Sequence, residues 1–271
     1  MTLQPAPPDS GVRFRRRDLV AAETEVIVGQ AEIMASHAQE PVLVNQHGAE
    51  VSGLRCLMAS MAAAGIDNAI IELDGPEVPA MDGSAAPFMR LIECAGLISQ
   101  PLPRRHLRLS RSLAFEQGDS WVRIGAATDR DPQIALSDDR PAPRQTIRHV
   151  FCMSEFAAEL AAARRSCLDE EIAKWRERGG GRGVSQDNTI IIAGALPGRQ
   201  AVDRLAATRM RRRVVDFVGD LALLGVPVLA DLSTHRYDVG LGIAVLESLR
   251  GLLDATSVPS IGHPEATADA G

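Results

Sequence analysis

Aromatic residues are scarce in this chain, at 3% of its 271 residues, and Lys174 is its only lysine. The formal net charge is −6, so arginine supplies nearly all of the positive charge, with clusters at Arg15–Arg17 and Arg209–Arg213. Proteins that bind nucleic acids are more often basic overall and carry aromatic side chains on which bases stack. The composition therefore argues against a nucleic acid as a partner.

Long apolar runs are missing too, since no stretch approaches the ~20 residues that a membrane-spanning helix requires. The opening MTLQPAPPDS lacks the basic and then apolar layout of a secretory signal. The cysteines form no CxxC pair and no disulfide ladder; they are Cys56, Cys94, Cys152 and Cys167. We expect a reduced, cytoplasmic protein without a transmembrane segment.

Histidine pairs are the third absence. None of the six histidines stands at HxxxH, HxxxD or HxH spacing; they are His37, His47, His106, His149, His235 and His263. Such spacings place two metal donors on one face of a helix or strand. The sequence therefore offers no local histidine pair that could hold a metal ion.

What is present is a repeated alternation of strands and helices. Helical spacing of apolar residues predicts helices over 51–64, 85–95, 155–164, 202–224 and 241–253. Strands are predicted near 12–14, 25–28, 41–45, 68–73, 106–115, 121–127, 146–151, 188–193 and 226–231, and a loop over 137–146. Gly65 should end the first helix, and a polar helix is expected over 169–178.

This order predicts an α+β fold of two similar domains, each a small sheet with two helices. The expected division is 1–104, 105–254 and a flexible tail over 255–271. The glycine run at 179–183 lacks the lysine of a P-loop, so we expect a mobile loop there rather than a phosphate cradle.

One long segment carries a specific resemblance. Gly65–Phe88 reads GIDNAIIELDGPEVPAMDGSAAPF, and it resembles the UDP-3-O-acyl-N-acetylglucosamine deacetylases, whose members carry GIDN followed by an MDGSAAPF stretch. Three further segments agree in order and spacing: Gln4–Leu19, Ser185–Asn188 and Asp216–Leu221. The resemblance covers nearly the whole chain up to about Leu253, although the family's first strands have no counterpart ahead of Met1.

The resemblance implies two α+β domains with the helices packed between the two sheets and a metal site at their junction. It also implies hydrolysis of the acetamide on a UDP-linked acylated glucosamine, in lipid A and lipopolysaccharide synthesis. That chemistry needs a Zn²⁺ held by three protein ligands, a base that takes a proton from water, and cationic groups that stabilise the oxyanion.

The family's functional positions are mostly altered here. The base position is Arg55, the acid position is Val239, counted without gaps from Asp220, and the oxyanion position is Arg165. The metal-ligand positions are Cys56, Arg212 and Asp216, of which only Asp216 retains the family residue. A small shift would bring His235 nearer the acid position. Cys56 could serve as a ligand, but its apolar helix face favours a place in the core.

These replacements lead to the expectation of a pseudoenzyme, a catalytically defective homologue that acts by binding or regulation and needs no cofactor. The partner would be a UDP-sugar or phosphate-bearing ligand, or an active deacetylase or other protein of the lipid A pathway. The alternative is an active or weakly active deacetylase of UDP-3-O-acyl-N-acetylglucosamine with an altered metal site, and Zn²⁺ is expected only in that case.

The arginines at the site allow two interpretations. Arg212 lies four residues before Asp216, a spacing that permits an ion pair on one helix face, so its guanidinium could fill the place of the metal. Alternatively Arg55, Arg165 and Arg212 converge as an anion-binding set that grips a phosphate or carboxylate.

Overall fold

The computed structural model describes residues 1–20, 24–36, 40–130, 132–139, 145–150, 152–168, 172–173, 177, 185–192 and 199–255. The glycine run at 179–183, most of the polar helix expected over 169–178, and the expected tail beyond Ala255 lie outside these residues.

The N-terminal half forms two small sheets. The first has the order β1-β7-β2-β3, made of β1 (Thr2–Pro5), β7 (Ala69–Leu73), β2 (Val12–Arg16) and β3 (Glu25–Ile27). The β2–β7 pair is parallel and the other pairs are antiparallel. The second sheet is antiparallel, with the order β4 (Glu32–Ala35), β5 (Pro41–Val44) and β6 (Glu50–Val51). Burial alternates along β2 and β7, so one face of the first sheet packs against the core.

The C-terminal half contains a five-stranded sheet with the order β11-β10-β14-β9-β8. Its strands are β8 (Leu113–Gln117), β9 (Ser120–Ala127), β10 (Gln133–Asp138), β11 (Gln145–Val150) and β14 (Ala230–His235). A two-stranded parallel sheet joins β12 (Arg165–Leu168) to β13 (Thr189–Ile192).

Several of the strand and loop boundaries predicted from the sequence are wrong. The loop predicted over 137–146 begins inside β10, a strand that the sequence reading missed. The strand predicted at 226–231 lies at 230–235, and the one predicted at 106–115 begins at Leu113. Short alternating segments permit such shifts, because the pairing partner rather than local composition decides which residues join the ladder.

The helices are α1 (Arg55–Ala64), α2 (Ala86–Ala95), α3 (Met153–Glu155), the π-helix η2 (Phe156–Leu160), α5 (Arg199–Ala222) and α6 (Val239–Ala255). The first predicted helix begins at Arg55 rather than at 51, because Val51 pairs in β6. Gly65 ends α1 as predicted, with a left-handed φ of 71° and its N–H donating to the carbonyl of Ala62. None of the described helices is both long and apolar enough to cross a membrane.

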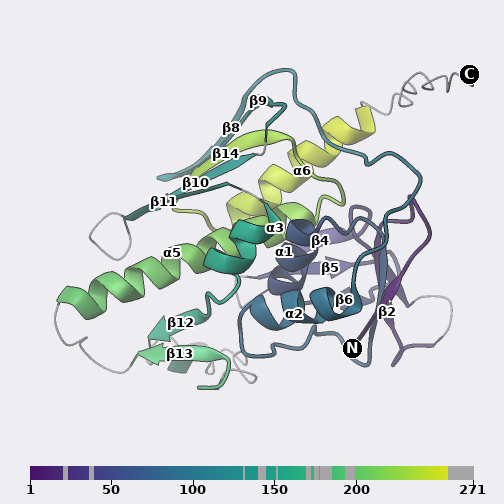
Figure 1. Cartoon of the computed structure of the whole chain (residues 1–271), viewed down its shortest axis with the longest axis horizontal. Helices are drawn as coiled ribbons and strands as arrows, with labels where there is room; N and C mark the ends of the chain where they lie inside the picture. Colours follow the sequence, from purple (N-terminus) through teal and green to yellow (C-terminus); the bar gives the residue numbers. More distant parts are fainter. Residues whose placement is uncertain are drawn as a thin grey trace, which may run out of the picture.

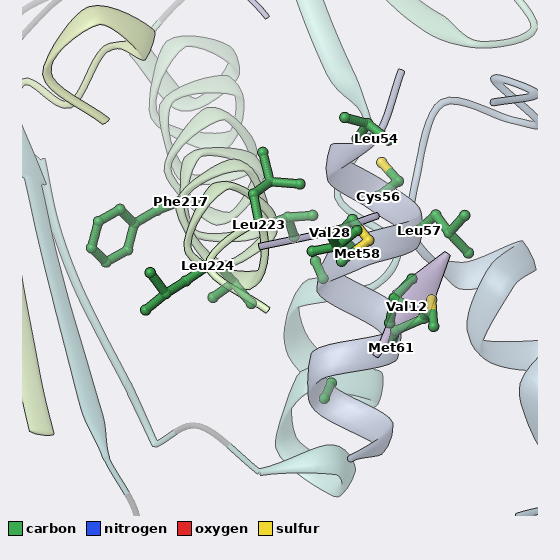
Figure 2. Close-up of a cluster of buried hydrophobic side chains, with 14 of the residues drawn as sticks. Val12, Val28, Leu54, Cys56, Leu57, Met58, Met61, Phe217, Leu223 and Leu224 are labelled. Atoms are coloured by element: carbon green, nitrogen blue, oxygen red, sulfur yellow. The ribbon is translucent and has the colours of Figure 1, made fainter. Parts of the chain in front are cut away.

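In Figure 1, α1, α5 and α6 lie between the five-stranded sheet and the strands of the N-terminal half. Figure 2 shows α1 and α5 side by side, with Met58 and Leu223 between them, while Phe217 points away from α1. The ring of Phe217 packs edge-on against Tyr237, with the ring centroids 4.9 Å apart.

A small residue allows this close approach of the two helices. A Cβ atom on Gly219 of α5 would lie 2.4 Å from the carbonyl oxygen of Arg55, at the start of α1. The expected fold class, α+β with helices packed between two sheets, is confirmed, while the division near residue 104 stays a prediction. The contact at Gly219 fixes the start of α1 against α5, where the candidate site lies.

Candidate functional site

The predicted site residues come from four different elements. Arg55 and Cys56 begin α1, Arg212 and Asp216 lie on α5, Val239 begins α6 and Arg165 begins β12. The structure brings Cys56, Arg212 and Asp216 into direct contact. Arg55 and Arg165 lie close enough for their charges to act on Asp216. Val239 is buried, and its apolar side chain supplies no proton donor at the expected acid position.

Arg212 is the centre of this cluster, and its side chain is only 9% exposed. Its Nε donates to Asp216 Oδ1 at 2.9 Å, which confirms the ion pair that the four-residue spacing predicted. Its Nη1 donates to Cys56 Sγ at 3.1 Å and to the carbonyl oxygen of Gly83 at 2.6 Å. One guanidinium group therefore joins α1, α5 and the turn before α2.

The turn at Asp82–Ser84 positions the carbonyl of Gly83. Asp82 Oδ1 accepts hydrogen bonds from the backbone N–H of Ser84 at 2.9 Å and from its hydroxyl at 2.7 Å. Gly83 has a φ of 79°, and a Cβ atom there would lie 1.7 Å from the carbonyl oxygen of Asn188. The GSAAPF segment and the Ser185–Asn188 segment, far apart in the sequence, thus meet at a point that only glycine can occupy.

A second buried ion pair adjoins the first. Arg55 donates to Asp220 through two parallel hydrogen bonds, Nε to Oδ1 at 2.7 Å and Nη2 to Oδ2 at 2.8 Å. The hydroxyl of Tyr237 also donates to Asp220 Oδ2, at 2.8 Å. Asp220 is 2% exposed and Tyr237 is 4% exposed.

The sequence reading assigned no role to Asp220 and Tyr237. The signal was available in part, because Asp220 stands one helical turn after Asp216 and Tyr237 is the only tyrosine.

Arg165 forms an ion pair with Glu40, beside β5. The neighbouring Ser166 accepts a hydrogen bond from Arg209 Nε at 3.0 Å. Each arginine of the predicted anion-binding set therefore has a carboxylate partner: Asp220 for Arg55, Glu40 for Arg165 and Asp216 for Arg212. That these arginines bind an external anion stays a prediction.

Burial and charge set the protonation of the cluster. Burial alone would raise the pKa of Asp216, but the charges of Arg212, Arg55 and Arg165 outweigh it and hold that pKa below its ordinary value. Burial alone would lower the pKa of Arg55, and the neighbouring Asp220 and Asp216 instead raise it. Asp216 and Arg55 therefore both stay charged at neutral pH.

The other two polar groups of the cluster stay neutral. Burial raises the pKa of the Cys56 thiol, and the charge of Arg212 offsets this only in part. Burial and the adjacent Asp220 raise the pKa of Tyr237 well above its ordinary value. Cys56 is thus a thiol rather than a thiolate, and Tyr237 remains a hydrogen-bond donor.

These residues do not fit the zinc ion that the resemblance implies. A catalytic zinc site uses three protein donors, with water in the fourth position. Cys56 and Asp216 are only two donors, and the cationic Arg212 donates to both. Within the described parts of the chain, no three His, Cys, Asp or Glu side chains form a group that could hold a metal ion.

His235 does not supply the missing donor or the acid. It lies on β14, where its Nδ1 is 2.9 Å from the hydroxyl of Ser137 and its ring stacks near Trp121 at 6.1 Å between centroids. None of its described contacts is with the cluster around Arg212.

Comparison with known proteins agrees with the resemblance found in the sequence. The profile of the UDP-3-O-acyl N-acetylglycosamine deacetylase family matches residues 1–250. A protein of Chromobacterium violaceum is 31% identical over 267 residues, covering 97% of this chain and 87% of its own length. Proteins of Acidithiobacillus ferrooxidans and of an Anaeromyxobacter species are each 34% identical, covering 91% and 92% of this chain and 81% of their own lengths.

All three relatives bear the name UDP-3-O-acyl-N-acetylglucosamine deacetylase, which is the name of an enzyme. This finding overturns the expectation that the chain is a pseudoenzyme. The family profile matches residues 1–250, and the segments that carry the resemblance meet around Gly83 and Gly219. The chain belongs to the UDP-3-O-acyl N-acetylglycosamine deacetylase family.

Proposed function

We propose that this chain is a weakly active deacetylase of UDP-3-O-acyl-N-acetylglucosamine and that the reaction takes place at the altered site around Arg212. The reaction would be a step of lipid A synthesis. The single observation that carries the proposal is the cluster itself. Family membership supports the substrate, and the family's catalytic positions Arg55, Cys56, Arg212 and Asp216 remain together between α1 and α5.

The charges of the cluster suit the chemistry of amide hydrolysis. Attack of water on an acetamide builds negative charge on the carbonyl oxygen, and buried cationic donors stabilise that oxyanion. After Arg212, the charges of Arg55 and Arg165 contribute most to lowering the pKa of Asp216. Asp216 is ionised, and its side chain is 20% exposed, so it is the carboxylate that would take the proton from water.

The same pairing explains why we expect slow turnover. A carboxylate that is held in an ion pair is a weaker base, because the charged form is stabilised. Arg212 occupies Asp216 Oδ1, and Asp220 occupies Arg55 through two hydrogen bonds. Substrate must compete with these internal partners for both the acid–base group and the oxyanion donors.

The test is release of acetate from UDP-3-O-acyl-N-acetylglucosamine, followed by mass spectrometry at high protein concentration. We expect slow product formation by the wild type that is lost in Asp216→Asn and kept in Asp129→Asn, whose exposed carboxylate lies far from the cluster in the sequence and pairs only at the surface. Circular dichroism would show that Asp216→Asn is folded. The proposal would be overturned if the folded wild type, at saturating substrate, formed product no faster than buffer alone.

A further inference from the structure

We infer that the guanidinium group of Arg212 takes the place of the metal ion in this chain, so that the site is assembled without zinc. The inference concerns the ion content of the site and is independent of whether the chain turns over substrate. It begins from the disagreement between the family's zinc chemistry and the donors that are present here.

The first argument is geometric. Zinc bonds to sulfur at about 2.3 Å and to carboxylate oxygen at about 2.0–2.2 Å. A zinc ion held by Cys56 and Asp216 would therefore lie between their donor atoms. In this chain Arg212 lies there instead, 3.1 Å from Cys56 Sγ and 2.9 Å from Asp216 Oδ1. The guanidinium and the ion cannot occupy that position together.

The second argument is that Arg212 is held in place from three sides. Besides Cys56 and Asp216, it donates to the carbonyl oxygen of Gly83 at 2.6 Å. That carbonyl is fixed by a turn in which any side chain on Gly83 would collide with Asn188. The long side chain of Arg212 is 9% exposed, so moving it out would leave Asp216 and the Gly83 carbonyl without their partner.

The third argument is charge balance. Three guanidinium groups, those of Arg55, Arg165 and Arg212, face three carboxylates, those of Asp216, Asp220 and Glu40. Arg212 therefore supplies the positive charge that Asp216 would otherwise receive from a zinc ion.

The substitution Arg212→His tests whether the guanidinium group takes the place of the metal ion. Arg212→His places an imidazole four residues before Asp216 on α5, on the side that faces Cys56. Cysteine, histidine and aspartate are all zinc ligands, and three protein ligands plus water are typical of a catalytic zinc site. The matched control is Arg211→His, which adds the same imidazole one residue earlier, at an exposed position.

The experiment measures zinc per chain by elemental analysis of tag-free protein, expressed with added zinc and then dialysed. We expect substoichiometric zinc in the wild type and in Arg211→His, and close to one zinc per chain in Arg212→His. Thermal unfolding gives a second readout. Zinc at a hundredfold excess over its Kd should raise the Tm of Arg212→His by about 5–10 °C and leave that of the wild type unchanged.

Two results would overturn the inference. The first is about one tightly held zinc per wild-type chain whose removal by chelator lowers the Tm. The second is a folded Arg212→His variant that takes up no more zinc than Arg211→His. If Arg212→His does not fold, the zinc content and the zinc-dependent Tm of the wild type still decide the matter, and neither readout depends on deacetylase activity.

Discussion

Replacing Arg55 by methionine tests whether the buried pair with Asp220 holds α1 against α5. Methionine keeps much of the length of the side chain but removes the charge and both hydrogen bonds to Asp220. Asp220 is 2% exposed, and after the substitution the hydroxyl of Tyr237 remains its described partner. The substitution therefore leaves a carboxylate buried without a cation.

The magnitude follows from burial. Removing one partner of a buried ion pair costs about 3–5 kcal/mol of unfolding free energy, because the other charge stays uncompensated. For a domain of 150–250 residues, each kcal/mol corresponds to a shift of about 2–4 °C, so Arg55→Met should lower the Tm by about 6–20 °C. The exposed pair of Arg108 with Asp129, also 2.8 Å long, offers a matched comparison: Arg108→Met should cost only about 0–1 kcal/mol.

Urea unfolding followed by circular dichroism measures both variants. The double variant Arg55→Met with Asp220→Asn should be more stable than Arg55→Met alone, because the amide carries no charge and can still accept a hydrogen bond from Tyr237. The reasoning would be refuted if Arg55→Met lost less than about 1 kcal/mol, or if the double variant were less stable than the single one by the full cost of a second substitution.

Two further predictions concern backbone packing and pH. Gly219→Ala should lower the free energy of unfolding by about 1–3 kcal/mol in urea, because its Cβ would lie 2.4 Å from the carbonyl oxygen of Arg55. The control is the exposed Gly251→Ala in α6, which should leave stability unchanged or raise it. Equal effects of the two substitutions would contradict the prediction. The hydrogen bond from Arg236, at 2.5 Å, lowers the pKa of Asp139 to about 2. This ion pair therefore stabilises the fold at pH values above the ordinary pKa of an aspartate, and the stabilisation is lost as the pH falls through about 2. An NMR titration should find that pKa raised in Arg236→Gln, and an unchanged value would count against the pair.

The sequence could predict those parts of the fold that depend on local signals. Gly65 marks the end of α1, since only glycine easily takes the left-handed conformation found there. The ion pair of Arg212 with Asp216 follows from their spacing on one helix. Strand β10 was missed, because its membership depends on pairing with β11 and β14 rather than on its own composition.

The candidate site was predictable only in part, for a related reason. The resemblance pointed to Cys56, Arg212 and Asp216, which are in direct contact, and to Arg55 and Arg165, whose charges act on Asp216. No sequence pattern indicated that Arg55 would pair with Asp220, which is 165 residues away. Long-range partners such as Glu40 for Arg165 are decided by packing, so the pairing of each arginine with its own carboxylate became apparent only from the structure.

The most direct measurement of the central claim is anomalous diffraction at the zinc absorption edge, from crystals of the wild type grown or soaked in zinc. The account predicts no peak between Cys56 Sγ and Asp216 Oδ1, with density for the Arg212 guanidinium there instead. Crystals of Arg212→His under the same conditions should show a peak at that place. A peak at high occupancy in the wild type, about 2.3 Å from Cys56 Sγ and with Arg212 displaced, would contradict the account.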